Sequence, residues 1–548
     1  MYAKPLSNSC LPLRTVPQFQ FNSWYNQIRN VEYTMSQITS RRRLYMGKRT
    51  RKQKQLIHIQ GRRAEAFRQL TAGIPYDKTL IAPLDVGKNA DWAAFHTRDG
   101  LLLHQPIEVP TLKDGYQRYV YTLDGLVTQH QPYLVILGHE PTGVYHESWA
   151  RNLMIRYADH LEGRAYPPFL YYFVNSYQVK LNRTQTFLSF DKTDQIDLAS
   201  IGDLLARGLG FPAHLPSATD LLVRQEVRSI RATQSEQRRV GNRIMTTFDQ
   251  LIPGAFLNTR RFARAHPNLP TPRPLATRPL ERQMIEALIT LCPNPYHILQ
   301  LDRYGIIDLF HQHGYRCGPK TADIILSVVQ RSLLPPPDVA PAFATILQRE
   351  FEHYQFLASQ HQKGLDSLEC LLPTTSARHL LPIPGTSPHL VARYLTGVGD
   401  VANVLFADQV WAKAGMNPSV YITGDVVIHG EMSKQGDPFF RDTLYLLGYQ
   451  LALHCAYFGD TFLKAIQRGK SEVEATIHTA HKVNRVFIHL LQHDEPFDPP
   501  DIPDYPAFCD QWEVRMQRYL AEKKQRRQHH TQRRRPRPAL ERSKGKRR

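Results

Sequence analysis

In two stretches of the chain, mostly apolar residues recur at alternating steps of four and three. This spacing predicts a long helix with one buried face in each stretch. The first stretch covers residues 223–251 and the second covers residues 347–368. The first has the members Val223, Val227, Ile230, Gln234, Gln237, Gly241, Ile244, Phe248 and Leu251, and the second has Leu347, Phe351, Tyr354, Ala358, His361, Leu365 and Leu368. Because such stripes are too long to leave in water, we expect these helices to pair with each other or with another subunit.

The stretch between the two helices is rich in proline, which interrupts both helices and strands. It holds Pro253, Pro267, Pro270, Pro272, Pro274, Pro279 and the run Pro335 to Pro337. We expect linkers around a small helical insert.

The chain before residue 223 mixes strand and helix patterns. Short apolar runs at 80–85, 133–140 and 168–175 are typical of buried strands, and an Asp-Gly pair at 99–100 indicates a hairpin. An amphipathic helix is expected near 144–161. This order predicts an α/β sheet with at least one parallel crossover.

The basic charge of the chain is concentrated at its two ends. The 548 residues hold 69 Lys and Arg against 49 Asp and Glu. Residues 1–78 hold 15 basic and 3 acidic side chains, and residues 523–548 hold 13 and 1, so the body between them is near neutral. We expect two disordered, flexible basic arms, the first with some nascent helix, that bind a polyanion, most often nucleic acid.

The six cysteines are far apart and form no C-x-x-C pair, which favours neither a zinc site nor a disulfide framework. The sequence shows no apolar segment typical of a signal peptide or a membrane span. We therefore expect a cytoplasmic, nucleoid-associated protein without membrane contact. Five segments are predicted: a basic arm at 1–78, an α/β domain at 79–222, a coiled-coil linker with its insert at 223–372, a mainly helical domain at 373–496, and a linker, short helix and basic tail at 497–548.

Four acidic residues stand where parallel strands and a helix can bring them together. Asp85 and Glu140 end two of the predicted strands, and Asp194 and Asp197 are three apart, on one face of a predicted helix. Each carboxylate alone has an ordinary structural explanation, such as a turn or a helix cap. Four converging carboxylates would repel one another unless divalent cations lay between them, as in two-metal phosphoryl transfer.

Four motifs in this order carry a resemblance to a known family. They are D-V-G-K (85–88), E-P-T-G (140–143), N-S-Y-Q-V-K (175–180) and K-T-D-Q-I-D (192–197). Together they resemble the amino-terminal domain of insertion-sequence 110 family transposases, which are DEDD enzymes described as bridge-RNA-guided recombinases. The resemblance implies an RNase H-like fold close to the RuvC resolvases. It also implies that Asp85, Glu140, Asp194 and Asp197 bind Mg²⁺ and are catalytic.

The second half of the chain extends the resemblance. Its motifs are L-P-I-P-G-T-S-P-H-L-V-A-R-Y-L (381–395), A-G-M-N-P (414–418), T-G (423–424) and G-E-M-S-K-Q-G (430–436), with R-D-T-L (441–444) after them. They are similar to the carboxy-terminal transposase domain of the same family.

The resemblance implies a hydroxyl nucleophile in this second domain. The family uses a serine there to attack DNA, and Thr423 fills its position in this chain. Threonine keeps a hydroxyl that can act as a nucleophile, although its extra methyl group crowds the attack. Ser433 and Ser419 are the nearby alternatives, and Ser433 suits a structural turn.

Three further residues are candidates for nucleic-acid binding. Gly385 lies in the P-G segment before a predicted helix, where backbone N–H groups suit phosphate. Lys434 and Arg441 would add positive charge near it.

The resemblance implies a transposase or recombinase of a mobile element that binds, cleaves and rejoins DNA. DNA, a guide (bridge) RNA and further copies of the chain, as a dimer or tetramer, are its expected partners. Two alternatives remain at this point. One is a RuvC-like metal-dependent nuclease that uses water, and the other is a nucleic-acid-binding transposase remnant without catalysis.

Overall fold

The computed structural model describes residues 62–141, 143, 145–186, 193–404, 406–423, 426–499 and 502–533. They belong to two compact units. Unit 1 ends at Pro216 and includes residues 400–405, with the 3₁₀ turn η5 (Val401–Asn403). Unit 2 holds Ser217–Gly399 and the chain from Phe406 onward. Residues 1–61 of the predicted basic arm and residues 534–548 of the predicted tail lie outside the described residues.

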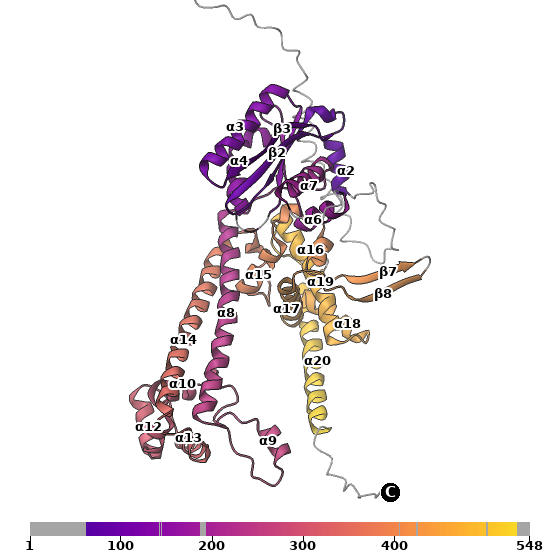
Figure 1. Ribbon diagram of the computed structural model, residues 1–548. Helices are drawn as coiled ribbons and strands as arrows, with labels where there is room; N and C mark the ends of the chain where they lie inside the picture. The colour runs from indigo at the N-terminus through magenta and orange to yellow at the C-terminus, as the bar shows by residue number, and fades with distance from the viewer. Residues whose placement is uncertain are drawn as a thin grey trace, which may run out of the picture. The chain divides into compact units, whose positions relative to one another are not determined.

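A six-stranded sheet forms the centre of unit 1 (Figure 1). Its strands are β1 (Thr79–Asp85), β2 (Ala90–Thr97), β3 (Leu102–Pro110), β4 (Leu134–His139), β5 (Phe169–Phe173) and β6 (Phe211–Pro212), in the order β3-β2-β1-β4-β5-β6. Strands β1, β4 and β5 are parallel, and the other neighbours are antiparallel. The predicted α/β sheet with parallel crossovers is confirmed. So is the hairpin at 99–100, where Gly100 has a φ of +97°.

Helices cover both faces of this sheet (Figure 1). One face carries α3 (Lys113–His130), α4 (Tyr145–Arg156) and α5 (Ala158–Leu161). The other carries α2 (Arg62–Leu70), α6 (Ser176–Gln185) and α7 (Asp194–Ala206), and the turn η1 (Tyr76–Lys78) precedes β1. Each face has its own apolar core, so the sheet is buried on both sides, as parallel strands require.

The prediction of a flexible arm over residues 1–78 is wrong for its last part. Helix α2 packs into the core of the α7 face through Phe67, which is 2% exposed. The Phe67 ring meets the Tyr172 ring edge-on at 6.1 Å. One buried aromatic ring therefore anchors a segment whose charge suggested disorder.

The two long helices of unit 2 pair with each other, which is one of the two expected arrangements, and they run in antiparallel directions. They are α8 (Ala218–Leu251) and α14 (Ala340–Leu371). Contacts run in reverse order along them: Glu226 with Ser367 at 3.1 Å, Gln234 with His361 at 2.8 Å, and Arg243 with Glu350 at 2.9 Å. The predicted contacts between subunits stay a prediction.

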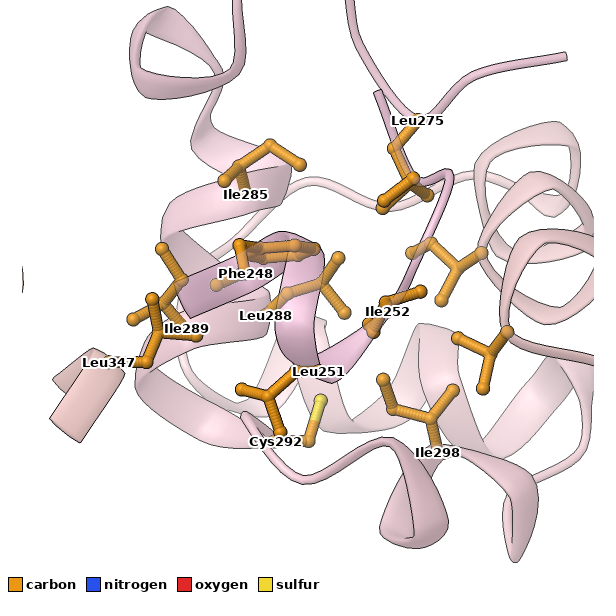
Figure 2. Close-up of a cluster of buried hydrophobic side chains, with 14 of the residues drawn as sticks. Phe248, Leu251, Ile252, Leu275, Ile285, Leu288, Ile289, Cys292, Ile298 and Leu347 are labelled. Atoms are coloured by element: carbon orange, nitrogen blue, oxygen red, sulfur yellow. The ribbon is translucent and has the colours of Figure 1, made fainter. Parts of the chain in front are cut away.

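A small helical bundle joins the far ends of α8 and α14, which confirms the predicted insert. It comprises α9 (Thr259–Ala265), η2 (Pro279–Glu281), α10 (Gln283–Leu291), α11 (Pro295–Leu299), α12 (Arg303–Gln312) and α13 (Pro319–Arg331). Figure 2 shows the end of α8, with Phe248, Leu251 and Ile252, surrounded by apolar side chains of the insert and Leu347 of α14. The insert is therefore folded around the tip of the coiled coil.

The remaining part of unit 2 is mainly helical, as predicted. Its elements are η3 (Leu372–Thr374), η4 (Ser376–His379), α15 (Pro388–Val398), α16 (Ala407–Lys413), α17 (Pro438–His454), α18 (Ala456–Gln467), α19 (Glu472–His493) and α20 (Tyr505–Arg533), with a hairpin of β7 (Pro418–Thr423) and β8 (Val426–Met432). Among the helices that the structure describes, none is long and apolar enough to cross a membrane.

Helix α20 corrects the prediction that the chain is disordered from residue 523. It continues to Arg533. Met516 is buried against α17–α19, and Lys523 forms an ion pair with Glu472 of α19. These contacts, together with a run of good helix formers, extend the helix into the basic tail.

Candidate catalytic carboxylates and hydroxyl

Asp85 and Glu140 lie at the same edge of the sheet. Asp85 is the last residue of β1, and Glu140 directly follows β4. The two strands are parallel, and Leu84 is paired with His139. Asp85 follows Leu84 and Glu140 follows His139, so the two acids stand at neighbouring positions of adjacent strands. Neighbouring strands are about 4.8 Å apart.

The two carboxylates also belong to the same face of the sheet. Side chains alternate between faces along a strand. Leu84 packs into the core under α3 and α4, whereas Ile81 and Ile136 pack into the core under α7. By this alternation, Asp85 shares the face of Ile81, and Glu140 shares the face of Ile136. Both acids therefore belong to the face of the sheet that α7 covers.

Helix α7 is linked to the sheet at its last residue. The Arg98 backbone N–H donates to the Thr79 carbonyl at the start of β1, at 3.0 Å. The Arg98 Nε donates to the carbonyl of Ala206, the last residue of α7, also at 3.0 Å. Asp194 and Asp197 belong to the first turn of the helix, at its other end.

Asp197 is engaged by a basic side chain of α6. Its side chain is buried, with the residue 7% exposed, and its Oδ1 lies 2.5 Å from Arg183 Nη1. Asp194, one turn earlier, is exposed. Within the described ranges, no three His, Cys, Asp or Glu side chains form a group that could hold a metal ion. The structure therefore brings Asp85 and Glu140 to one edge of the sheet, and its described residues do not assemble the four predicted acids into a metal site.

The fit to Mg²⁺ differs among the four residues. Asp85 and Glu140 offer the hard oxygen ligands that Mg²⁺ prefers, on adjacent strand ends. Asp197 offers the same oxygen chemistry, but its carboxylate faces the Arg183 guanidinium. Asp197 could join a metal site only after this ion pair opens.

Asp91 is a buried carboxylate that the sequence interpretation missed. It is 0% exposed, and it accepts hydrogen bonds from the Gly87 N–H and the Trp149 Nε1–H, each at 2.9 Å. Burial raises the pKa of Asp91, and these hydrogen bonds oppose the rise. Gly87 is in the turn after Asp85, so Asp91 fixes this turn against α4. A polar Asn-Ala-Asp stretch opening a buried strand was the only signal in the sequence.

Thr423 is the last residue of β7 and is paired with Val426 at the start of β8. The hairpin was not predicted, although a Gly-Asp pair between the runs V-Y-I-T and V-V-I-H is a hairpin signal. The two motifs that set the register of Thr423 are in contact. Lys434 N–H donates to the Gly415 carbonyl at 3.0 Å, and Ser433 N–H donates to the Asn417 carbonyl at 2.8 Å.

The two alternative serines both donate to backbone carbonyls. Ser433 Oγ donates to Gly415 at 3.4 Å, within the turn that follows β8. Ser419 Oγ donates to Glu431 at 3.1 Å, across the hairpin. Their hydrogen bonds agree with structural roles.

Gly385 has a packing reason to be glycine. Its φ is +94°, and a Cβ there would lie 2.9 Å from the Gln450 carbonyl oxygen of α17. The start of α15 after it is capped by Ser387, whose Oγ accepts from the Leu390 N–H at 3.3 Å. Its predicted role in binding nucleic acid is untested.

Lys434 and Arg441 differ in how much of their charge is available. Lys434 is exposed, with a φ of +55°. Arg441 donates through Nη1 to the carbonyls of Ala414 and Lys434, at 3.0 and 3.3 Å. Arg441 therefore holds the turn after β8 together, whereas Lys434 presents its ammonium group to solvent.

The comparison with known proteins bears on this second half of the chain. Residues 377–462 match the family described as Transposase IS116/IS110/IS902 family. No curated protein matches the chain. The matched stretch runs from η4 into α18 and includes the hairpin with Thr423. Residues 377–462 are therefore similar to transposases of the IS116/IS110/IS902 family, in agreement with the sequence resemblance.

Proposed function

We propose that this chain is a mobile-element transposase that cleaves and rejoins DNA by phosphoryl transfer. One observation carries the proposal. Asp85 and Glu140 stand at the ends of the adjacent parallel strands β1 and β4, at the same edge of the sheet. The family match of residues 377–462 supports the class of reaction. We further propose that the sheet of unit 1 is RNase H-like and RuvC-like, as the resemblance implies.

The proposed ligands of Mg²⁺ are Asp85 and Glu140 first, with Asp194 and Asp197 completing the set. When bound, Mg²⁺ would neutralise charge on the scissile phosphate and stabilise the transition state. Asp197 would exchange the Arg183 guanidinium for the metal, which leaves Arg183 able to pair with a phosphate oxygen.

Thr423 is the proposed nucleophile. Its hydroxyl would lose its proton to solvent water and form a P–O bond to the scissile phosphate. The bond from phosphorus to the deoxyribose oxygen would break, and that oxygen would take up a proton from solvent water. The resulting phosphothreonine ester would keep the energy of the DNA linkage for rejoining. Guidance by RNA and assembly into a dimer or tetramer are proposed on the resemblance alone.

Single carboxylate variants test the proposal. We expect Asp85→Asn and Glu140→Gln to reduce strand transfer by at least 100-fold while duplex DNA binding stays within about twofold. Asp114→Asn, an exposed acid on α3, is the matched control and should be as active as the unchanged protein. Full strand transfer by both site variants would overturn the assignment.

The Arg183–Asp197 ion pair favours a second candidate, a nucleic-acid-binding remnant without catalysis. In a remnant, a resident arginine would permanently take the place of a cation. Titration calorimetry with Mn²⁺ separates the two candidates: binding that Asp85→Asn abolishes supports the transposase, and absence of binding supports the remnant. Mn²⁺-dependent cleavage that survives Thr423→Ala would instead indicate a nuclease that uses water.

A further inference from the structure

A loop leaves the core of the insert at Ala255 and returns to it at Leu275. The Leu275 N–H donates to the Ala255 carbonyl at 2.8 Å, and both residues are buried. Figure 2 shows Leu275 within the same apolar cluster as Ile252. Residues 256–274 form the excursion between these points, named here the arginine loop. In Figure 1 its helix α9 lies apart from the bundle of α10, α12 and α13.

Several contacts hold the arginine loop in one arrangement. Phe256 packs on Phe248 of α8, with the ring centroids 4.8 Å apart. Asn258 caps α9 by accepting from the Arg261 N–H at 3.1 Å. Near the other end, Arg331 of α13 donates to the Arg273 carbonyl at 2.5 Å. Four prolines between 267 and 274 restrict the backbone further.

The charge of the loop is of one sign only. Residues 256–274 contain four arginines, Arg260, Arg261, Arg264 and Arg273, and no Asp or Glu. All four are exposed. Within the part of the chain that the structure describes, their guanidinium groups make no ion pair and no hydrogen bond.

The rest of the insert has the opposite character. Residues 275–338 hold six basic and six acidic side chains. One of these arginines, Arg303, pairs with Asp323 at 2.6 Å. The positive and negative charges of the bundle thus offset one another, whereas the positive charge of the arginine loop has no acidic counterpart within the loop.

Such a loop is unfavourable without a partner. Four like charges on 19 residues repel one another. Guanidinium groups match phosphate oxygens in geometry and charge. On α9, Arg260 and Arg264 are four residues apart and therefore follow one side of the helix.

We propose that the arginine loop binds the phosphate backbone of duplex DNA, without reading its sequence. The choice of DNA rests on the proposed function, because a transposase must hold the duplex that it cuts. The loop adds a contact on unit 2 that is separate from the basic tail and from the hairpin with Thr423. Its backbone is ordered before binding, so little conformational entropy is lost when DNA binds.

The test replaces the four arginines by glutamine in the full chain and measures binding to duplex DNA across a range of salt concentrations. Each lost phosphate contact should reduce the slope of log K against log salt by about 0.9. We expect a total reduction of about 2 to 4, with at least a tenfold loss of affinity at low salt. Four lysines in place of the arginines should keep the slope within about 1 of the original.

A matched variant removes four exposed positive charges from the coiled coil: Arg228, Arg238, Arg349 and Lys363. It should keep the original slope. An equal reduction in this variant, or no reduction in the loop variant, would overturn the proposal. A loop variant that loses duplex RNA but keeps duplex DNA would overturn the choice of DNA. If strand transfer is absent from the unchanged protein while the slope still falls, the proposed chemistry fails and the DNA contact stands.

Discussion

Asp91 offers a direct measurement of how the turn after Asp85 is held. Asp91→Ala would leave the Gly87 N–H and the Trp149 Nε1–H without an acceptor in a buried place. We expect the free energy of unfolding of unit 1 to fall by about 2 to 4 kcal/mol. Asp91→Asn should lose about half as much, because its single carbonyl oxygen faces two donors. Chemical denaturation measures both.

The control for this measurement is Asp114→Ala on the surface of α3, which should change the free energy of unfolding by less than about 0.5 kcal/mol. If Asp91→Ala is equally mild, water reaches the two donors, and Asp91 does not fix the turn.

The prediction for Thr423 concerns its covalent adduct with DNA. Thr423→Ser removes the methyl group and keeps the hydroxyl, so covalent DNA adducts should form at an equal or higher rate. Thr423→Ala should abolish the adduct and leave DNA binding within about twofold. Denaturing gels with end-labelled DNA detect the adduct. Strand transfer that survives Thr423→Ala but fails in Ser433→Ala would assign the nucleophile to Ser433.

The placement of Asp85 and Glu140 could be predicted from the sequence, because each acid ends a run of buried apolar residues and parallel strands share an edge. The Arg183–Asp197 pair could not. The two residues are 14 positions apart on different helices, and only the packing of α6 on α7 brings them together. Asp91 was equally hidden, because its partner Trp149 is 58 residues away.

Among the elements, the coiled coil has a tight point at Gly364 of α14. A Cβ there would lie 2.7 Å from Cγ1 of the buried Ile230 of α8. Alanine favours a helix over glycine by about 1 kcal/mol, but overpacking costs about 1 to 3 kcal/mol. We expect Gly364→Ala to lower the midpoint of thermal unfolding.

Gly125 of α3 is the matched control, because nothing lies within 4 Å of a Cβ built there. Gly125→Ala should raise the stability of unit 1 by about 0.5 to 1 kcal/mol. A stabilising Gly364→Ala would mean that α8 and α14 can separate slightly at this point, which the close contact argues against.

Elements whose apolar residues recur with a regular period could be predicted from the sequence. Elements that depend on turn chemistry or on contacts with distant residues were harder to predict. The seams of α8 and α14 follow from spacing alone. Hairpin β7–β8 lies between helices α16 and α17, in a region whose other elements are helical. Helices α2 and α20 run into basic segments because Phe67 and Met516 are buried by other elements, which local charge does not reveal.

For the whole molecule, the charge of the carboxy-terminal tail can be tested by ending the chain at Arg533, the last residue of α20. The removed residues 534–548 hold eight basic side chains and one acidic side chain. We expect weaker binding to nucleic acid at low salt and a shallower dependence on salt, since fewer counterions are released. Fluorescence anisotropy measures both. A variant with the eight basic residues changed to glutamine should behave like the truncation, whereas an unchanged slope in both would assign the tail another role.

Helix α8 is also a spacer whose length can be expressed in base pairs. The Arg231 guanidinium lies 4.3 Å from the centroid of the Phe439 ring of α17, which marks where the matched stretch 377–462 meets the helix. Between Arg231 and Leu251, just before the arginine loop, the helix rises about 30 Å. This distance equals about nine base pairs of B-form DNA, at about 3.4 Å each. A duplex held only at the two ends of this spacer would therefore present nearly the same side to both, since one helical turn is about 10 base pairs.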